Sequence, residues 1–274
     1  MTHAAQVCVL QCASVADLDV AYLWTTRLVG VYALLDSLEK LAIRREFTDD
    51  GAFSWAHIRD ARVFASALPV LDRLFAFRPW VRCLGVRAVC AASLLVLDGT
   101  PLTLSLAVLV GLGMLVNLRH FPFGAETQNR MGLMILIVLL IHAVARGPRT
   151  ATAGLWFIAA QACFSYLTAG LSKLLRREWR DGRAPAAILG SPAALGCGRL
   201  GLLLRRHPLA ARFLGWTTIG VECTFPLALS GQPLLAVYLA WGLLFHLAIA
   251  VVLRLNLFMW VWWATYPAII FTAR

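Results

Sequence analysis

The sequence predicts an all-α fold: a polytopic transmembrane helical bundle of about eight spans, forming a single membrane domain over residues 1–274. Two observations lead to this prediction. The chain is 60% hydrophobic and only 14% charged, whereas a soluble domain is about half apolar and roughly a quarter charged. The apolar residues also gather in stretches of about 17–25 residues, the length that crosses a bilayer as a helix. Because polar sequence is too scarce to cover a soluble globule, lipid must be the solvent for most of the surface.

The spans follow one another with short connections. Turn-forming sequences at 98–101, 147–148 and 230–233 separate neighbouring apolar stretches. In chain order, the predicted spans are 20–41, 80–98, 101–117, 131–146, 151–174, 212–230, 233–253 and 255–273.

One or two further segments are expected to lie in the membrane interface. Residues 61–78 are too polar and too interrupted by proline to span, and they mix apolar with basic residues as interfacial helices do. The Gly- and Pro-rich residues 185–205 indicate either a second interfacial element or a re-entrant segment.

Basic residues are concentrated in two of the predicted loops. Residues 42–79 carry six arginines and residues 175–212 carry eight, whereas 1–19, 99–100 and 231–232 carry no lysine or arginine. With eight spans both basic loops fall on one side, which the positive-inside rule assigns to the cytoplasm of a multi-pass cell-membrane protein. Contact with anionic headgroups therefore explains the formal charge of +11. The lipid bilayer is the expected partner, and nucleic acid is not.

The sequence carries no common catalytic or metal-binding motif. Its seven cysteines form no C-x-x-C pair, and their scatter through predicted helices is typical of small apolar side chains rather than of a disulfide framework. Phosphate-binding glycine loops, the serine-hydrolase elbow and the H-E-x-x-H zinc motif are missing, so no metal is expected. The N-terminus lacks the basic region of a secretory signal, and no cleaved segment is expected.

Ionisable residues inside apolar helices are costly unless paired, so each is a functional candidate. The predicted spans contain Arg27, Asp36, Lys173, Glu222 and His246, with the amide of Gln161 in addition. Arg27 and Asp36 are nine residues apart, on opposite helix faces, so each needs a partner elsewhere. A pair between Arg27 and Glu222 is one hypothesis. A structural pair for Glu222 and a packing role for His246 remain open.

Lys173 ends a helix face that is otherwise small. Going back at helical spacing gives Ala169, Tyr166, Ala162 and Ala159, with Gly170 alongside. Small side chains allow a neighbouring helix to approach closely, and a desolvated lysine favours the neutral amine, which can act as a base. The alternative is that Lys173 snorkels to the headgroups beside Arg176 and Arg177.

The run Tyr166–Gly182 (YLTAGLSKLLRREWRDG) resembles the horizontally transferred transmembrane (HTTM) family, which is related to vitamin K-dependent γ-carboxylase. Its specific part is the pattern A-G-L-x-K-L-x4-W-x2-G. Further stretches agree in order over most of the chain. They are 27–36, 47–51, 222–226 and 245–258.

This resemblance implies a role for Lys173. In the carboxylases, the second of two lysines in the pattern is regarded as the base that deprotonates vitamin K hydroquinone, and Lys173 occupies its position. The first lysine is Ser172 here, and the Asn-His element that precedes an earlier carboxylase helix is not reproduced, with Gln128-Asn129-Arg130 standing nearby instead. Residues 1–274 also hold no counterpart of the extramembrane domain that binds the animal enzyme's protein substrate. Glutamate carboxylation by these residues alone is therefore not expected.

Two kinds of function remain open, and the sequence does not decide whether the protein is an enzyme. The first is a carboxylase- or oxidoreductase-like membrane enzyme that uses a reduced isoprenoid quinone. Lys173 would be its catalytic base, and Tyr166, Glu222, His246 and Arg27 would bind the substrate. The second is a non-catalytic membrane partner for the maturation or export of a peptide or protein. A small transporter is disfavoured because no inverted repeat is visible.

Overall fold

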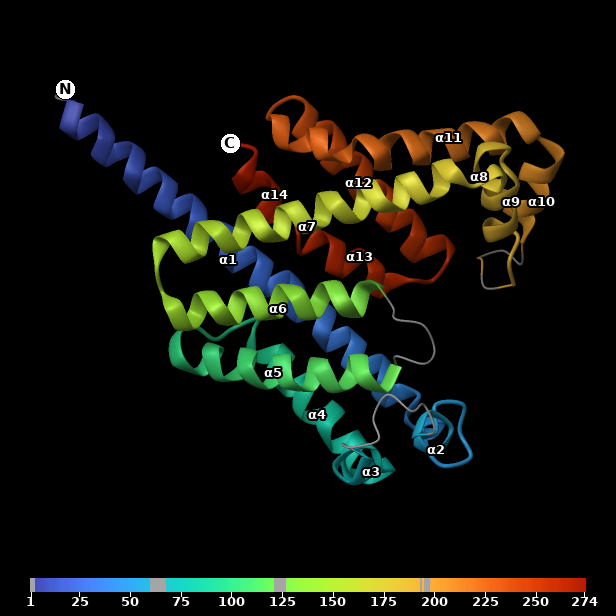
Figure 1. Ribbon diagram of the computed structural model, residues 1–274, viewed down its shortest axis with the longest axis horizontal. Coiled ribbons are helices and arrows are strands. Elements are labelled where there is room, and N and C mark those ends of the chain that lie inside the picture. The colour runs from blue at the N-terminus through green and yellow to red at the C-terminus, as the bar shows by residue number, and fades with distance from the viewer. Residues whose placement is uncertain (1–2, 60–67, 121–126, 193, 195–197) are drawn as a thin grey trace. The chain divides into compact units, whose positions relative to one another are not determined.

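The computed structural model describes residues 3–59, 68–120, 127–192, 194 and 198–274, with side chains from residue 17 onward except those of 58 and 68. Helices make up most of the described residues, which contain no strand. The predicted all-α class is confirmed. Figure 1 shows the helices in chain order.

Within the part of the chain that the structure describes, five helices are long and apolar enough to cross a membrane. They are residues 17–42 of α1 (His3–Ala42), α5 (Gly99–His120), α6 (Thr127–Ala145), α7 (Pro148–Leu175) and α12 (Leu234–Val252). The predicted spans 20–41, 101–117, 131–146, 151–174 and 233–253 coincide with them. These five helices are compatible with a membrane protein.

The other three predicted spans fall on shorter or interrupted helices. Residues 80–98 begin within α4 (Phe77–Ser93), an arginine-containing helix of 17 residues. Residues 212–230 divide between α11 (Pro208–Thr224) and the 3₁₀ helix η4 (Phe225–Ser230). Residues 255–273 divide between α13 (Asn256–Trp263) and α14 (Tyr266–Thr272). The predicted boundaries missed these breaks because hydropathy alone does not register a change of helix direction.

The described helices form two compact units. The first comprises residues 1–25 and 151–274, and the second comprises residues 26–150. The end of α1 lies in the second unit with η1 (Arg44–Phe47), α2 (Trp55–Arg59), α3 (Leu68–Phe75), α4, α5 and α6. Most of α7 and the helices that follow it lie in the first unit.

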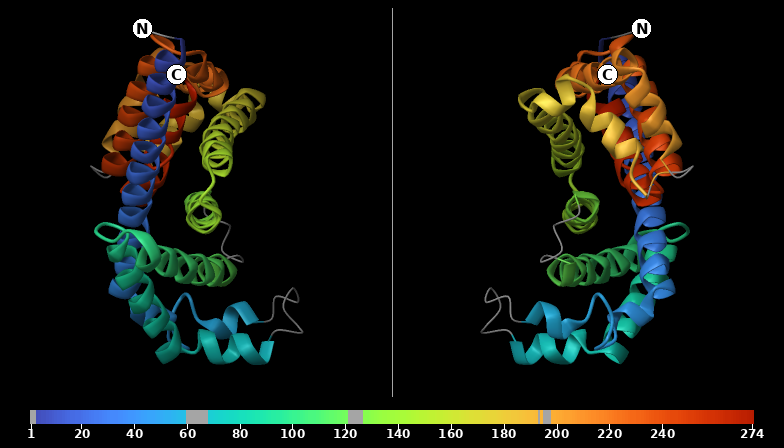
Figure 2. Two further views of the ribbon diagram at one scale, coloured as in Figure 1. Left: turned by 90° about the vertical axis from the view of Figure 1, so that its left-hand side faces the viewer. Right: turned by 90° about the vertical axis from the view of Figure 1, so that its right-hand side faces the viewer.

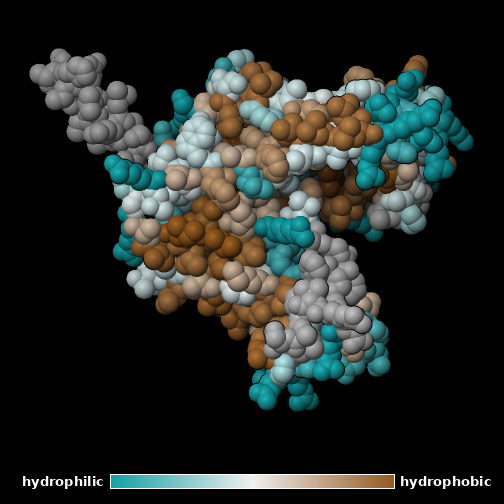
Figure 3. All heavy atoms as spheres, in the orientation of Figure 1, coloured by the Kyte–Doolittle hydropathy of each residue, from teal (hydrophilic) through white to brown (hydrophobic). Residues whose placement is uncertain are grey.

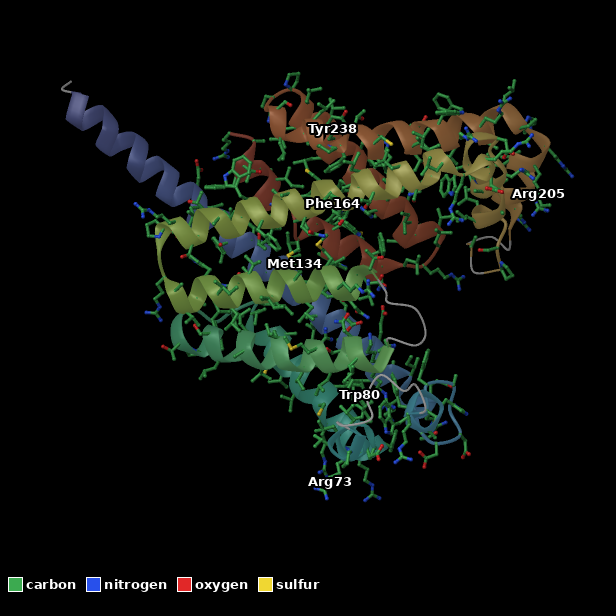
Figure 4. The ribbon with its side chains drawn as sticks, in the orientation of Figure 1. Arg73, Trp80, Met134, Phe164, Arg205 and Tyr238 are labelled. Atoms are coloured by element: carbon green, nitrogen blue, oxygen red, sulfur yellow. The ribbon has the colours of Figure 1, made fainter. Side chains whose placement is uncertain are left out.

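An aromatic core holds the second unit together. Phe47, Trp55, Phe75 and Trp80 are buried against one another with Leu71, Leu84 and Val116. Phe75 meets Trp55 and Trp80 edge to face, with ring centroids 4.6 Å and 5.4 Å apart. Figure 4 labels Trp80 on α4. Aromatic side chains bury large apolar areas, so these rings fix the segment 43–59 and α3 against α4.

The predicted interfacial segment 61–78 is described only in part, since residues 61–67 lie outside the described residues. Its second half contains α3, which buries Leu71 and Phe75 and exposes Val70 and Arg73, as an amphipathic helix does. Asp72 accepts hydrogen bonds from Arg59 (2.9 and 2.8 Å) and from the indole of Trp55 (2.7 Å). These hydrogen bonds, that from Arg59 first, lower the pKa of the Asp72 carboxyl.

In the first unit, α7 packs through the small-residue face that the sequence predicts. Ala159, Ala162, Tyr166 and Gly170 are all buried. A Cβ atom at Gly170 would lie 2.6 Å from the backbone nitrogen of Cys223 on α11. The absence of a side chain at Gly170 therefore sets how closely α7 and α11 approach.

The predicted element 185–205 corresponds to two short helices, α9 (Arg183–Leu189) and α10 (Arg199–Arg206), that pack with α8 (Arg177–Arg180) near the start of α11 (Figures 1 and 2). Gly182 and Gly198 begin α9 and α10 with φ of +83° and +79°, values that favour glycine. A Cβ at Gly201 would meet the backbone of Gly190. These glycines let α9 and α10 touch backbone to backbone.

The long helices expose apolar side chains to their surroundings. Leu104 on α5, Phe164 on α7 and Leu244 on α12 are each more than half exposed. Figure 3 shows hydrophobic atoms over the sides of the long helices, while hydrophilic atoms gather around α8–α10. Large exposed apolar surfaces are rare on soluble monomers, so these faces fit contact with lipid.

We predict that Gly170→Ala lowers stability by about 1–3 kcal/mol, because the added methyl group must push α11 away from α7. Gly220→Ala is the matched control, since nothing lies within 4 Å of a Cβ at that position on α11. Thermal unfolding of the purified protein in detergent measures both. Equal melting temperatures for the two variants would contradict the close approach at Gly170.

Candidate functional site

Tyr166 and His246 form a buried hydrogen-bonded pair between α7 and α12. The Tyr166 hydroxyl lies 2.7 Å from Nε2 of His246. Both residues are almost inaccessible, and Nδ1 of His246 has no hydrogen-bond partner among the described residues. A phenol that donates to Nε2 requires the tautomer with a proton on Nδ1. In this pair the phenol donates and Nε2 accepts, while Nδ1 of His246 makes no hydrogen bond to the described residues.

Aromatic rings enclose this pair. Phe225 stacks on Tyr166 with ring centroids 3.7 Å apart, and Trp262 lies 5.1 Å from Tyr166. Trp262 is also nearly parallel to His246 at 5.6 Å, and Phe258 approaches His246 at 5.6 Å. The pair is therefore surrounded mainly by flat aromatic rings, which offer few polar groups.

Gly242 leaves room for the hydroxyl groups of two tyrosines beside the Tyr166–His246 pair. It precedes His246 by one turn of α12, and a Cβ atom there would lie 3.3 Å from the Tyr166 hydroxyl and closer still to that of Tyr266. Any larger residue at Gly242 would displace them. A glycine thus brings the hydroxyl groups of α7 and α14 to one point on α12.

Lys173 and Glu222 form a second pair, between α7 and α11. Lys173 Nζ donates to Glu222 Oε2 at 2.6 Å, and the Glu222 side chain is 4% exposed. The same amine lies 5.1 Å from the centre of the Trp179 ring, a cation–π contact. The amine is held by a carboxylate and an indole, which disfavours the snorkelling interpretation. Glu222 has the structural partner that the sequence left open.

The two pairs share one face of α7. Tyr166 and Lys173 are seven residues apart, two helical turns or about 10.5 Å along the axis. Their hydrogen-bond partners lie on other helices, Glu222 on α11 and His246 on α12. The first unit therefore brings together Tyr166, Lys173, Glu222 and His246.

Arg27 lies in the second unit and has its partners there. Its Nη1 donates to the backbone oxygen of Leu94 at 2.5 Å, and its Nη2 lies 3.6 Å from Asp98. The hypothesis that Arg27 pairs with Glu222 is wrong, because Lys173 satisfies Glu222 and the end of α4 satisfies Arg27. The substrate-binding role expected of Arg27 stays a prediction.

A buried charge cluster in the second unit was not anticipated. Asp36, fully buried on α1, accepts from Arg87 Nη1 of α4 at 2.6 Å and from Lys40 one turn along its own helix. Arg87 also donates to Ser37 Oγ at 2.7 Å. The expectation that Asp36 finds a partner away from Arg27 is confirmed. Arg87 was overlooked although it stands inside the predicted span 80–98, where its charge was the available signal.

Arg119 is a second buried cation that the sequence reading missed. It donates to the backbone oxygen of Phe75 at 2.7 Å and to that of Phe53 at 3.2 Å. Its guanidinium also lies about 5 Å from the ring centres of Phe47, Phe75 and Trp80. Carbonyl oxygens and aromatic faces stabilise this cation. Arg119 lies just beyond the predicted span 101–117, so it was not among the intramembrane charges that the sequence predicts.

Metal ligands and thiols add nothing to the site. Among the described residues, no three His, Cys, Asp or Glu side chains gather in a way that could hold a metal ion. The described cysteines Cys83, Cys90, Cys163 and Cys223 are free thiols.

Comparison with known proteins gives no match to a family model, a curated protein or a solved structure. The resemblance to the HTTM family therefore stays a prediction that rests on the residues of the chain.

We predict that Arg87→Met destabilises the protein by about 3–5 kcal/mol, because it removes one of the two cations that compensate the buried carboxylate of Asp36. Arg82→Met is the matched control, since Arg82 is exposed on the same helix and its loss should change stability by about 0.5 kcal/mol or less. Thermal unfolding in detergent measures both. If Arg87→Met and Arg82→Met have the same melting temperature, the cluster does not stabilise the second unit.

Proposed function

We propose that the protein is a multi-pass cell-membrane enzyme related to the membrane domain of vitamin K-dependent γ-carboxylase, with Lys173 as base and a reduced isoprenoid quinone as co-substrate. In this proposal α4, α11 with η4, and α13 with α14 complete eight spans around the five long helices. The single observation that carries it is the Lys173–Glu222 hydrogen bond, on the same helix face as the Tyr166–His246 pair.

The Lys173–Glu222 pair can act as a proton acceptor. Glu222 is buried and Lys173 is mostly buried, so the amine and the carboxylate are in direct contact with little water around them. When the shared proton resides on Glu222, Lys173 is a free amine that can accept a proton from a substrate. The Trp179 ring, 5.1 Å from the Lys173 amine, limits where this side chain can lie.

The Tyr166–His246 pair fits a planar ligand that carries oxygen atoms. Its unpartnered Nδ1 and the hydroxyls of Tyr166 and Tyr266 are hydrogen-bonding groups among the faces of Phe225 and Trp262. A reduced quinone would supply two ring hydroxyls and, on oxidation, the driving force for the reaction. Tyr166 and His246 would hold and orient such a ring, and the surrounding aromatic side chains would exclude water.

The residues that carry the resemblance have local structural roles that agree with one another. Gly170 allows α11 to approach, so that Glu222 reaches Lys173. The Trp179 ring lies against the Lys173 amine. Gly182 has a positive φ and begins α9. The pattern thus describes one local arrangement around the amine, which supports placing Lys173 at the centre of the site.

A second candidate function is a non-catalytic membrane partner for the maturation or export of a peptide or protein. The exposed arginines between Arg176 and Arg212 favour it, because they could bind an acidic segment. This function requires no base at Lys173.

The proposed enzyme should lose its activity in Lys173→Met, which keeps the length of the side chain and removes the amine. We expect membranes that contain the wild-type chain to oxidise vitamin K hydroquinone, used as the probe, with dissolved dioxygen accepting the two electrons and two protons. The variant should be slower by about a hundredfold or more, as for the loss of a general base. The quinone product is followed by fluorescence or chromatography.

Ser172→Ala is the control, since the Ser172 hydroxyl is exposed and bonds only to the Ala169 carbonyl of its own helix. It should retain the wild-type rate. Oxidation no faster than in membranes lacking the protein, or an unchanged rate in Lys173→Met, would refute the proposal. A partner protein would instead tolerate Lys173→Met and fail when the arginines of 175–212 are replaced.

A further inference from the structure

The outward face of α10 mixes large apolar side chains with arginines. Leu202 and Leu203 are 56% and 51% exposed, while Leu204 and Gly201 face inward. Arg199 and Arg206 lie on the same outward side, at helical spacing from Leu202 and Leu203. In water such leucines would cost free energy, whereas at a membrane surface they enter the acyl boundary and the arginines reach the headgroups.

The neighbouring segments repeat this combination. At the start of α11, Leu209 and Phe213 are 78% and 74% exposed and stand one helical turn apart, with Arg212 between them. On α8, Arg177 and Arg180 are exposed. Between residues 175 and 212 the sequence has eight arginines but only two acids, and one of these, Asp181, is bonded to Arg183 at 2.8 Å. The positive charge of this surface is therefore largely uncompensated.

These segments are held together as one surface, which we name the basic platform (α8, α9, α10 and residues 207–213). Glycine contacts join them: Gly182 lies against Ala211, and Gly201 lies against Gly190. Hydrophilic atoms gather at this end of α11 in Figure 3, and Arg205 extends from α10 in Figure 4. Because the helices are packed backbone to backbone, the arginines have a fixed spacing rather than that of a mobile loop.

We propose that the basic platform is a binding surface for anionic phospholipids, with its arginines on the headgroup phosphates and its exposed leucines and Phe213 in the acyl boundary. Guanidinium groups suit phosphate oxygens because they donate parallel hydrogen bonds. The arginines attract anionic lipid, and the apolar side chains between them hold the surface at the depth of the headgroups. The proposal requires only that the long apolar helices cross a membrane, and it does not depend on the reaction at Lys173.

Lipid binding to the full-length protein tests the proposal. We expect Arg205→Gln/Arg206→Gln to bind short-chain phosphatidylglycerol about tenfold more weakly than the wild type, with no change for phosphatidylcholine. Native mass spectrometry of the protein titrated with each lipid measures both affinities. Added salt should weaken the phosphatidylglycerol complex of the wild type, because the headgroup contacts are exposed and screened.

Two further variants complete the test. Arg146→Gln/Arg149→Gln removes the same charge from two exposed residues, Arg146 between α6 and α7 and Arg149 in the first turn of α7, and should bind phosphatidylglycerol as the wild type does. Arg205→Lys/Arg206→Lys keeps the charge and should retain most of the binding, which excludes loss through misfolding. Wild-type affinity in the Arg205/Arg206 glutamine variant, an equal loss in the Arg146/Arg149 variant, or equal binding of the two lipids would each overturn the proposal.

Discussion

Pairing of charges between apolar helices is the constraint on which the rest of this structure depends. An ionised side chain among apolar helices is stable only when a partner replaces the water that it loses. In the first unit Lys173 and Glu222 meet this requirement across α7 and α11, and in the second Asp36 meets it with Arg87 and Lys40. The Lys173–Glu222 and Asp36–Arg87 pairs each join two different helices. The pairs therefore specify which helices must be neighbours, while apolar surface alone would allow many arrangements.

Small residues make these pairings geometrically possible. Gly170 permits the contact with α11 that puts Glu222 within reach of Lys173, and Gly242 permits the phenols of Tyr166 and Tyr266 to meet on α12. Where apolar surface is available on both sides of an interface, close packing rather than hydrophobic transfer discriminates between helix partners. Glycine thus contributes to the site although it supplies no functional group.

The same reasoning separates the two buried clusters by chemistry. Around Tyr166 and Lys173, hydrogen-bonded donors and acceptors lie among aromatic rings, which suits proton transfer in a dry environment. Around Asp36, both carboxylate oxygens are already bonded to cations, and Arg119 is satisfied by carbonyl oxygens and aromatic faces. A saturated cluster of this kind stabilises the fold and leaves little capacity to exchange protons with a substrate.

The sequence by itself determined the all-α class, five helices long and apolar enough to cross a membrane, and the choice of Lys173, Tyr166, Glu222 and His246 as candidate residues. Hydropathy and helical spacing are local properties, so these features follow from neighbouring residues alone. Only the tertiary structure decided which charges pair. Arg27 and Glu222 look equally available in the sequence, yet Lys173 takes Glu222 because Gly170 brings α11 against α7. The roles of Arg87 and Arg119 are likewise visible only in the tertiary structure, because their partners come from distant segments. These partners are a carboxylate for Arg87, and carbonyl oxygens and aromatic rings for Arg119. Pairing between helices is set by how the helices pack and not by spacing along the chain.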